Sequence, residues 1–393
     1  MAAMEKNNKN LNVPNLRFPE FSGEWEKEFL GTTCNVLMCK RILASQTNAE
    51  CGVPFYKIGT IGGAPDAYIS KELFESYRAK YNYPRKGEVM ITCAGTVGKA
   101  MIFDGEDSYY QDSNIVWIDN PTNKIDNTFL YHLISKVDWS KLNTTTIVRI
   151  YNDDLRQLRI SYPTLSEQRK ISIFLSLLNQ RIETQRKIIE DLKKLKDAIT
   201  HFHFRNELMH SPMTYIGQYI TQVSIRNKDT KIDRVLSVSN KYGFVDQDEQ
   251  FEDRVVASID TSNYKVVQKG DFAYNPARIN VGSVARLQEF ENGIVSPMYV
   301  CFTTNKELLP AYFELYLSTN IFKHEMKKRL EGSVRLCLTY ESLCKIKIAL
   351  PEFSVQTDLA SNVSALLTKI KNEERLLCLY HDFKQYLLTQ MFI

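Results

Sequence analysis

Two stretches of the chain share one layout: YPTLSEQ at residues 162–168 and LPEFSVQ at residues 350–356. Each places a proline, a hydrophobic residue and a glutamine at the start of a long helical pattern. The second stretch has Val355 where the first has Glu167, which weakens its capping signal. The repeat predicts that one structural unit occurs twice in the chain.

The helices that follow keep one register. Their hydrophobic residues recur at spacings of three and four, which places them on one face of a helix. This predicted seam consists of Ile171, Leu175, Leu178, Ile182, Ile189, Leu192, Leu195 and Ile199, and at matching places in the second copy of Leu359, Val363, Leu366, Ile370, Leu377, Tyr380, Phe383 and Leu387. Because the stripe is narrow and its flanks are charged, it predicts a coiled coil rather than a globular core helix.

The parallel continues upstream of each helix. Lys86-Gly87-Glu88 matches Lys269-Gly270-Asp271, and Val97-Gly98 matches Val281-Gly282. Both copies contain short β-rich runs, then a helical segment and a last short strand. The order predicts an α+β fold in which similar domains at 13–162 and 206–350 are each followed by a long helix, at 163–205 and 351–393, with a disordered tail at 1–12. The alternative is one large domain with chance similarity between its halves.

Composition limits the class of protein. With 44% hydrophobic and 24% charged residues, the chain can bury sizeable cores. A formal net charge of +4 neither proves nor opposes nucleic-acid binding. Residues 1–12 do not resemble a signal peptide, and no run approaches the roughly 18 apolar residues of a membrane span. The eight cysteines form no CxxC pair, which argues against a zinc site or disulfide framework and fits reduced thiols in a cytoplasm.

Catalytic motifs are incomplete. Asn275-Pro276-Ala277-Arg278 begins like a DNA amino-methyltransferase motif and then departs from it. The stretch 95–99 has too few residues between its glycines for a phosphate loop. Residues 325–327 have nuclease-like spacing without an aspartate at a suitable distance before them. We therefore expect no catalytic site and no metal site in this chain.

The sharpest binding candidates are two equivalent glycine-bearing loops, 92–98 and 276–282, where backbone can approach a ligand closely. In the second loop, Arg278 can form two hydrogen bonds with guanine, and Asn280 can form two with adenine. Ala94 and Thr96 hold the corresponding places in the first loop, so the two loops are not expected to read the same bases. Thr92, at the start of the first loop, and Lys99, directly after it, are further candidates for contact with DNA. The alternative is a tight hairpin without a ligand.

Basic and aromatic residues alternate between residues 77 and 86, where Arg78, Lys80 and Lys86 are candidates for phosphate contact. An ordinary charged surface explains this stretch equally well. Arg149 and Arg335 each follow a polar turn shortly before the last strand of a copy. Phosphate contact and a surface ion pair remain alternatives for both.

The chain resembles the specificity subunit of type I restriction-modification enzymes. The resemblance covers nearly the whole chain from Val13 onward and lies in VPNLRFPEF at 13–21 with Trp25, the repeated Lys-Gly-acid turn, YNPARINVGS at 274–283 and the Pro-x-hydrophobic-x-x-Gln helix start. No single motif is decisive; the twofold layout carries most of the weight.

The resemblance implies two target-recognition domains that each read one half of a split site in double-stranded DNA. It also implies two antiparallel long helices that separate these domains and dock two methyltransferase subunits, which motor-nuclease subunits join. The methyl donor, ATP and magnesium would belong to those partners, leaving this chain without a cofactor. Independently, two similar domains linked by antiparallel helices have the pseudo-twofold symmetry that suits two half-sites on a duplex. The alternatives are a self-contained DNA methyltransferase or nuclease, and a coiled-coil scaffold that does not bind DNA.

Overall fold

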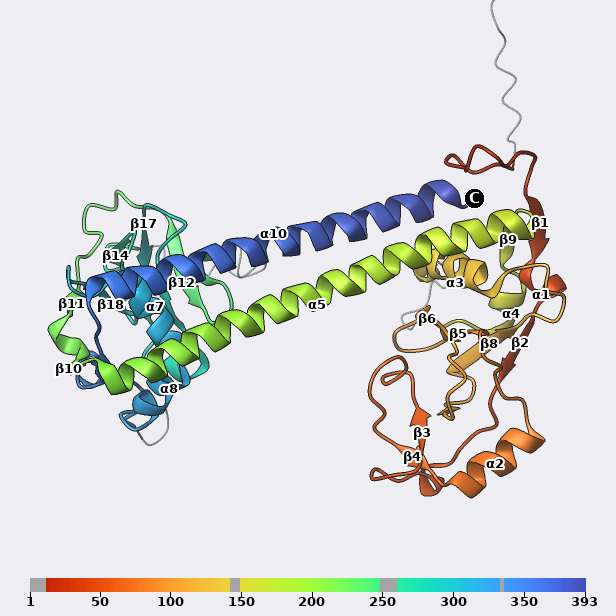
Figure 1. Ribbon diagram of the computed structural model, residues 1–393, viewed down its shortest axis with the longest axis horizontal. Helices are drawn as coiled ribbons and strands as arrows, with labels where there is room; N and C mark the ends of the chain where they lie inside the picture. Colours follow the sequence, from red (N-terminus) through yellow and green to blue (C-terminus); the bar gives the residue numbers. More distant parts are fainter. Residues whose placement is uncertain (1–11, 142–148, 248–259, 333–335) are drawn as a thin grey trace, which may run out of the picture. The chain divides into compact units, whose positions relative to one another are not determined.

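The computed structural model describes residues 12–141, 149–247, 260–332 and 336–393. The chain divides into two compact units, Met1–Gln185 with Leu376–Ile393, and Arg186–Arg375. Each unit contains β-sheets and short helices (Figure 1). Two long helices, α5 (Leu165–His210) and α10 (Phe353–Met391), have residues in both units.

A four-stranded antiparallel sheet lies at the centre of the first unit. Its order is β2 (Asn35–Met38), β8 (Ile115–Asp119), β5 (Val89–Thr92) and β6 (Ala100–Ile102). Successive residues of a strand point to opposite faces. Ile91 and Ile118 pack in one core with helix α3 (Asn127–Lys136), whereas Met90 and Trp117 pack in another. Burial on both faces explains the continuous apolar runs of β5 and β8.

A smaller sheet and short elements complete the first unit. The smaller sheet has the order β4 (Tyr68–Ile69), β3 (Val53–Tyr56) and β7 (Tyr109–Tyr110), with β3 and β7 parallel. The remaining elements are β1 (Glu26–Phe29), which pairs with β9 (Arg159–Tyr162), and α1 (Leu30–Thr33), η1 (Ala44–Gln46), α2 (Lys71–Lys80), η2 (Trp139–Lys141) and α4 (Asn152–Arg156).

The second unit repeats the main sheet of the first. Its order is β11 (Ile220–Val223), β18 (Val300–Thr304), β15 (Phe272–Tyr274) and β16 (Val284–Arg286), again antiparallel. A second sheet has the order β13 (Gly243–Asp246), β12 (Val235–Ser239), β17 (Asn292–Val295) and β14 (Lys265–Gln268), with β12 and β17 parallel. The remaining elements are β10 (Met213–Tyr215), which pairs with β19 (Lys347–Ala349), and η3 (Ile216–Gln218), η4 (Ile279–Val281), α7 (Pro310–Ser318), α8 (Asn320–Lys327) and α9 (Tyr340–Cys344).

The repeated Lys-Gly-acid turns have the same geometry in both units. Gly87 and Gly270 adopt φ angles of 90° and 97°, which favour glycine. Glu88 Oε2 accepts a hydrogen bond from the backbone N–H three residues earlier at 2.8 Å, and Asp271 Oδ2 does the same at 2.8 Å. The motif is therefore a turn closed by its own carboxylate, and the predicted repeat is confirmed together with the α+β fold class.

The long helices run antiparallel within each unit. In the first unit Arg181 Nε donates to the Tyr380 hydroxyl at 3.0 Å, while Ile171 shares a core with Leu387. In the second unit Lys193 pairs with Glu374 at 2.6 Å, while residues 204 and 359 share a core. Helix α5 ends at His210, beyond the boundary at 205 that the sequence suggested.

The predicted seam is buried over part of its length. Buried members are Ile171, Leu175, Ile182, Ile189, Leu359, Val363, Ile370 and Leu387, and half-buried ones are Leu178, Leu192, Leu366, Leu377 and Tyr380. The prediction fails at Leu195, Ile199 and Phe383, which are exposed. At about 100° per residue, Leu195 and Phe383 each lie roughly 120° around the helix from the first seam residue, so a straight helix turns them away from its partner.

Within the described parts of the chain, no helix combines the length and apolar character that a membrane crossing needs.

Candidate nucleic-acid interface

The second candidate loop connects β15 to β16. It is closed by a hydrogen bond from the Asn275 N–H to the Ser283 carbonyl at 3.1 Å, and Gly282 has a φ of 97°. Ile279 is buried and anchors the loop, whereas Arg278 and Asn280 are exposed. The two side chains that sequence analysis selected for base contact therefore both face solvent from one anchored turn.

The first candidate loop connects β5 to β6 and is built differently. Thr92 is fully buried, and its hydroxyl donates to the Thr96 carbonyl and accepts from the Lys99 N–H at 3.0 Å. Thr92 therefore shapes the loop and is not accessible to a ligand in this conformation. Thr96 and Lys99 are exposed, and the Lys99 ammonium donates to the Ile61 carbonyl at 2.6 Å.

A tryptophan supports this first loop. A Cβ atom on Gly98 would lie 2.1 Å from Trp139 Cδ1, and Gly98 has a φ of 82°. Only glycine fits this position, because both the backbone conformation and the indole ring exclude a side chain. The sequence predicted a compact loop that contains Gly98, but it did not predict the contact of Gly98 with Trp139.

An equivalent backbone hydrogen bond ties each loop to a later segment of its own unit. The Ile150 N–H donates to the Cys93 carbonyl at 2.9 Å, and the Leu338 N–H donates to the Pro276 carbonyl at 3.1 Å. Burial raises the pKa of the Cys93 thiol to about 12, so this cysteine stays protonated and is a poor nucleophile. The equivalence confirms that the two loops occupy corresponding places.

Arg149 lies directly before Ile150 and therefore close to the first loop. Its guanidinium donates to Ser113 Oγ at 3.3 Å and lies 5.8 Å from the centre of the Tyr151 ring. The proposed counterpart, Arg335, lies outside the described residues.

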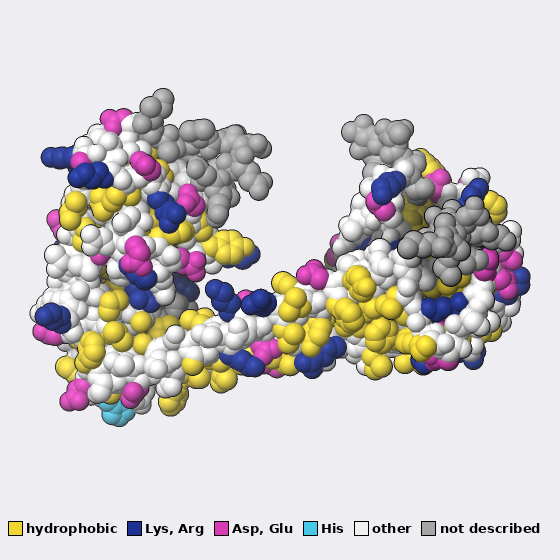
Figure 2. All heavy atoms as spheres, turned by 90° about the horizontal axis from the view of Figure 1, so that it is seen from above, with side chains coloured by type: hydrophobic (Ala, Val, Ile, Leu, Met, Phe, Trp, Pro, Cys, Tyr) yellow, Lys and Arg dark blue, Asp and Glu magenta, His cyan; other side chains and the backbone are white. Residues whose placement is uncertain are grey.

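The basic and aromatic residues at 77–86 form the end of α2 and the following turn. Arg78 pairs with Asp107 at 2.9 Å and stacks over Tyr83 at 5.1 Å, so its charge is already partly compensated. Lys80 and Lys86 are exposed. On the face seen in Figure 2, basic and acidic side chains are interspersed over both units, and no single basic patch stands out.

A pocket of about 590 Å³ lies beside the second loop. Arg278 and Asn275 contribute to its wall from the loop; Gln247, which directly follows β13, and Met298, which lies between β17 and β18, contribute as well. Gln247 was not predicted from the sequence, because it follows β13 and is separated from the loop in sequence by β14 and β15. Among the described residues, no group of three or more His, Cys, Asp or Glu side chains is arranged to hold a metal ion.

A contact that the sequence did not predict fixes the N-terminal segment to α5. Arg17 forms a bidentate ion pair with Glu167: Nε donates to Oε1 at 2.7 Å, and Nη2 donates to Oε2 at 2.6 Å. Glu167 is only 1% exposed, and Arg17 also donates to the Gly23 carbonyl at 2.6 Å. Val355 stands at the equivalent place in the second unit, so this ion pair has no counterpart there.

Two apolar stripes on the long helices are exposed, and hydrophobic side chains are visible along the helices in Figure 2. The α5 stripe consists of Leu195, Ile199 and Phe202, and the α10 stripe consists of Leu379, Phe383 and Tyr386. These side chains are between 38% and 74% exposed, and both stripes have spacings of four and then three residues. Such stripes are typical of helix surfaces that a partner covers.

Comparison with known proteins gives relatives of one kind. The family model of the type I restriction modification DNA specificity domain matches residues 22–194. A Haemophilus influenzae protein described as a type I restriction enzyme specificity subunit is 53% identical over 142 residues, which are 36% of this chain and 37% of that protein. This match therefore spans little more than a third of the relative.

Other similarities extend over nearly the whole chain. The MjaX type I restriction enzyme specificity subunit of Methanocaldococcus jannaschii is 23% identical over 93% of each protein. The crystal structure of a type I restriction-modification S subunit from M. genitalium matches with a TM-score of 0.58 and 18% identity, covering 97% of this chain and 99% of that one. A chain from a structure of the type I R-M system matches with a TM-score of 0.56, 14% identity and coverage of 94% and 97%. These structures show that the fold is shared.

Proposed function

We propose that this chain is the non-catalytic subunit that reads a split DNA site for a methyltransferase and restriction complex, a proposal supported by its similarity to type I restriction-modification specificity subunits. Each unit would read one half-site. The observation that carries this proposal is the pair of equivalent loops, β5–β6 and β15–β16, which share strand order and backbone support but differ in exposed side chains. Different side chains at equivalent places permit two different half-site sequences.

The exposed stripes support a second part of the proposal, the docking of two methyltransferase subunits. An exposed apolar stripe of three side chains occurs on each long helix, so each helix offers a surface on which a partner could dock. Burying such side chains against a partner stabilises a complex by roughly 25 cal/mol per Å² of apolar surface before the costs of association. Motor-nuclease subunits would join this assembly, and the methyl donor, ATP and magnesium would bind to the partner subunits.

The experiment that tests the proposal is a map of methylated sites in DNA from cells with and without this chain. We expect a two-part methylated sequence that disappears when the chain is deleted. Purified chain that methylates or cuts DNA without partners would contradict the non-catalytic role. Methylation that persists unchanged without the chain would contradict the role in recognition.

Mutation of the stripes tests the docking surface. Replacing Leu195 and Phe202 together by Asp should reduce the amount of methyltransferase subunit that co-purifies with the chain. Replacing Leu379 and Tyr386 together by Asp should have the same effect. The exposed Ser361 and Ala365 on α10, replaced in the same way, serve as controls. Full recovery of the partner with both stripes altered would remove this surface from the docking site.

A further inference from the structure

The pocket beside Arg278 has a composition that fits the edges of bases. Its wall combines one guanidinium with amide and hydroxyl groups, including Gln247, Asn275, Ser237 and Ser296, and none of the described residues that line it carries a carboxylate. Met298 adds an exposed apolar side chain to the wall. Donors and acceptors with a single positive charge match the polar edges of base pairs, and an apolar side chain suits the methyl group of thymine.

Gln247 has an unusual environment within this pocket. Its Oε1 atom is buried and has no hydrogen-bond partner among the described residues. A buried acceptor without a partner is costly, so such groups are rare in folded proteins and call for a physical explanation. A ligand that supplies an N–H group, reached by a change in the rotamer of the whole side chain, would satisfy this acceptor.

We propose that Gln247 and Arg278 read neighbouring base pairs of the second unit's half-site, with Arg278 on guanine and Gln247 on adenine. The guanidinium can donate to O6 and N7 of guanine, and the carboxamide can accept from N6 and donate to N7 of adenine. Gln247 directly follows β13 and Arg278 lies in the β15–β16 loop, but both line one pocket, so they can meet adjacent base pairs. This inference rests on the proposed function and adds a specificity residue outside the β15–β16 loop.

The test compares two variants of Gln247 in the full complex, in cells that make it. Gln247→Met keeps the approximate size of the side chain and removes both hydrogen-bonding groups, so preference for adenine at one position should fall by about 5- to 150-fold. Gln247→Glu keeps only acceptors and should shift that position toward cytosine, whose N4 amine donates. Gln222→Glu, an exposed change on β11 away from the pocket, is the matched control and should leave the motif unchanged.

Methylated-site mapping reads out both half-sites in each strain, and thermal unfolding of the purified variants checks that they fold. The inference is overturned if Gln247→Met folds and leaves the second half-site unchanged, or if the change falls in the first half-site. Should Gln247→Glu give no methylation, the Met variant alone decides. Failure of the proposed function looks different, because the wild-type chain would then give no two-part motif.

Discussion

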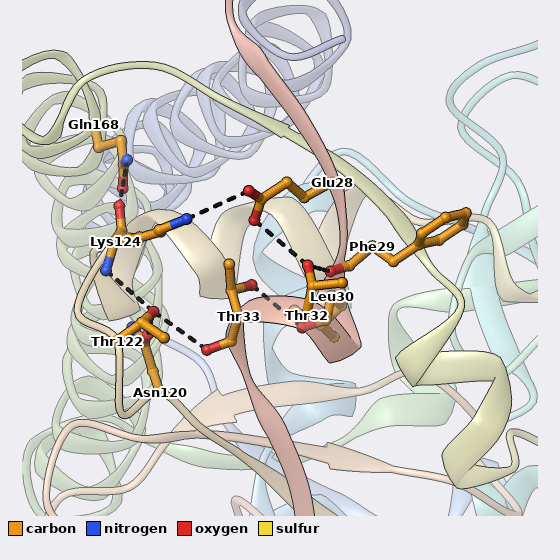
Figure 3. Close-up of polar contacts among 9 residues, drawn as sticks. All are labelled: Glu28, Phe29, Leu30, Thr32, Thr33, Asn120, Thr122, Lys124 and Gln168. Atoms are coloured by element: carbon orange, nitrogen blue, oxygen red, sulfur yellow. Dashed lines mark hydrogen bonds and ion pairs between the residues drawn. The ribbon is translucent and has the colours of Figure 1, made fainter.

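Gln168 and Gln356, which hold equivalent places in the two copies of the repeat, make the same three hydrogen bonds at the starts of the two long helices. Gln168 Nε2 donates to the carbonyls of Pro163 at 2.8 Å and Lys124 at 3.0 Å, and its Oε1 accepts from the Asp126 N–H at 2.7 Å. Figure 3 shows the contact with Lys124, whose ammonium in turn reaches Glu28 at 3.4 Å.

Gln356 repeats this arrangement in the second unit. Its Nε2 donates to the carbonyls of Pro351 at 3.0 Å and Glu307 at 2.9 Å, and its Oε1 accepts from the Leu309 N–H at 2.9 Å. Both glutamines are almost completely buried. Each therefore ties the loop before a short helix to the start of a long one.

The first prediction concerns these two glutamines. Gln168→Met and Gln356→Met should each lower the free energy of unfolding by at least about 1–3 kcal/mol, because each leaves buried backbone groups without a partner. Denaturant unfolding measures the effect, and Gln180→Met, an exposed change on α5, is the control. Equal stability of the three variants would show that these bonds contribute little.

The second prediction concerns Arg17 and Glu167. Arg17→Ala should destabilise the first unit by about 3–5 kcal/mol, because it leaves the buried Glu167 carboxylate unpaired. It should also release residues 12–25, which hydrogen exchange of their amides would detect. Lys170→Ala removes a solvent-exposed pair with Glu20 and should change stability far less than Arg17→Ala. Similar effects of both changes would contradict this assignment.

The third prediction concerns the reading of half-sites. Arg278→Ala or Asn280→Ala should relax the methylated sequence in one half-site only, at about 1–3 kcal/mol of discrimination for each lost base contact. Thr96→Ala in the first loop is the complementary control and should affect the other half-site. Relaxation of both half-sites by a single change would show that the loops do not read independently.

The fourth prediction concerns phosphate contacts. Lys86→Ala should weaken binding to all DNA sequences and lower the slope of log affinity against log salt by about 0.9. Arg78→Ala should have a smaller effect, since Arg78 already pairs with Asp107. Lys71→Ala at the other end of α2 is the control. Titrations at several salt concentrations measure the slope, and an unchanged slope for Lys86→Ala would remove that residue from the interface.

The fifth prediction concerns the Lys-Gly-acid turns. Burial raises the pKa of both Glu88 and Asp271. A raised pKa in the folded state means that ionisation opposes folding, so stability is lost as pH rises through that pKa. Glu88→Gln and Asp271→Asn keep an acceptor for the turn and remove this loss.

The difference in free energy of unfolding between each variant and the wild type should therefore favour the variant more at pH 7 than at pH 4. Denaturant unfolding at the two pH values measures the difference. Glu75→Gln, an exposed change on α2, is the matched control. A stability difference that does not vary with pH would contradict the role assigned to burial.

The sequence alone determined the repeated architecture of this protein. The register of Gln168 and Gln356, the matched Lys-Gly-acid turns and the two equivalent loops were all visible in it. These features depend on local chemistry: a glycine with positive φ, a helix start, and alternation along a strand. These preferences act over short stretches of chain, so the local conformation can be predicted from residues that are close in sequence.

Tertiary structure decided which of those residues are accessible and which distant side chains meet. Periodicity predicted that Leu195 and Phe383 lie in the seam, but the rotation of about 100° per residue along each helix turns them to the surface. Arg17 meets Glu167 from a distant part of the chain, Gly98 is fixed by Trp139, and Gln247 joins the pocket of Arg278. Such contacts follow from how sheets and helices pack, because packing brings together residues that no local pattern in the sequence connects.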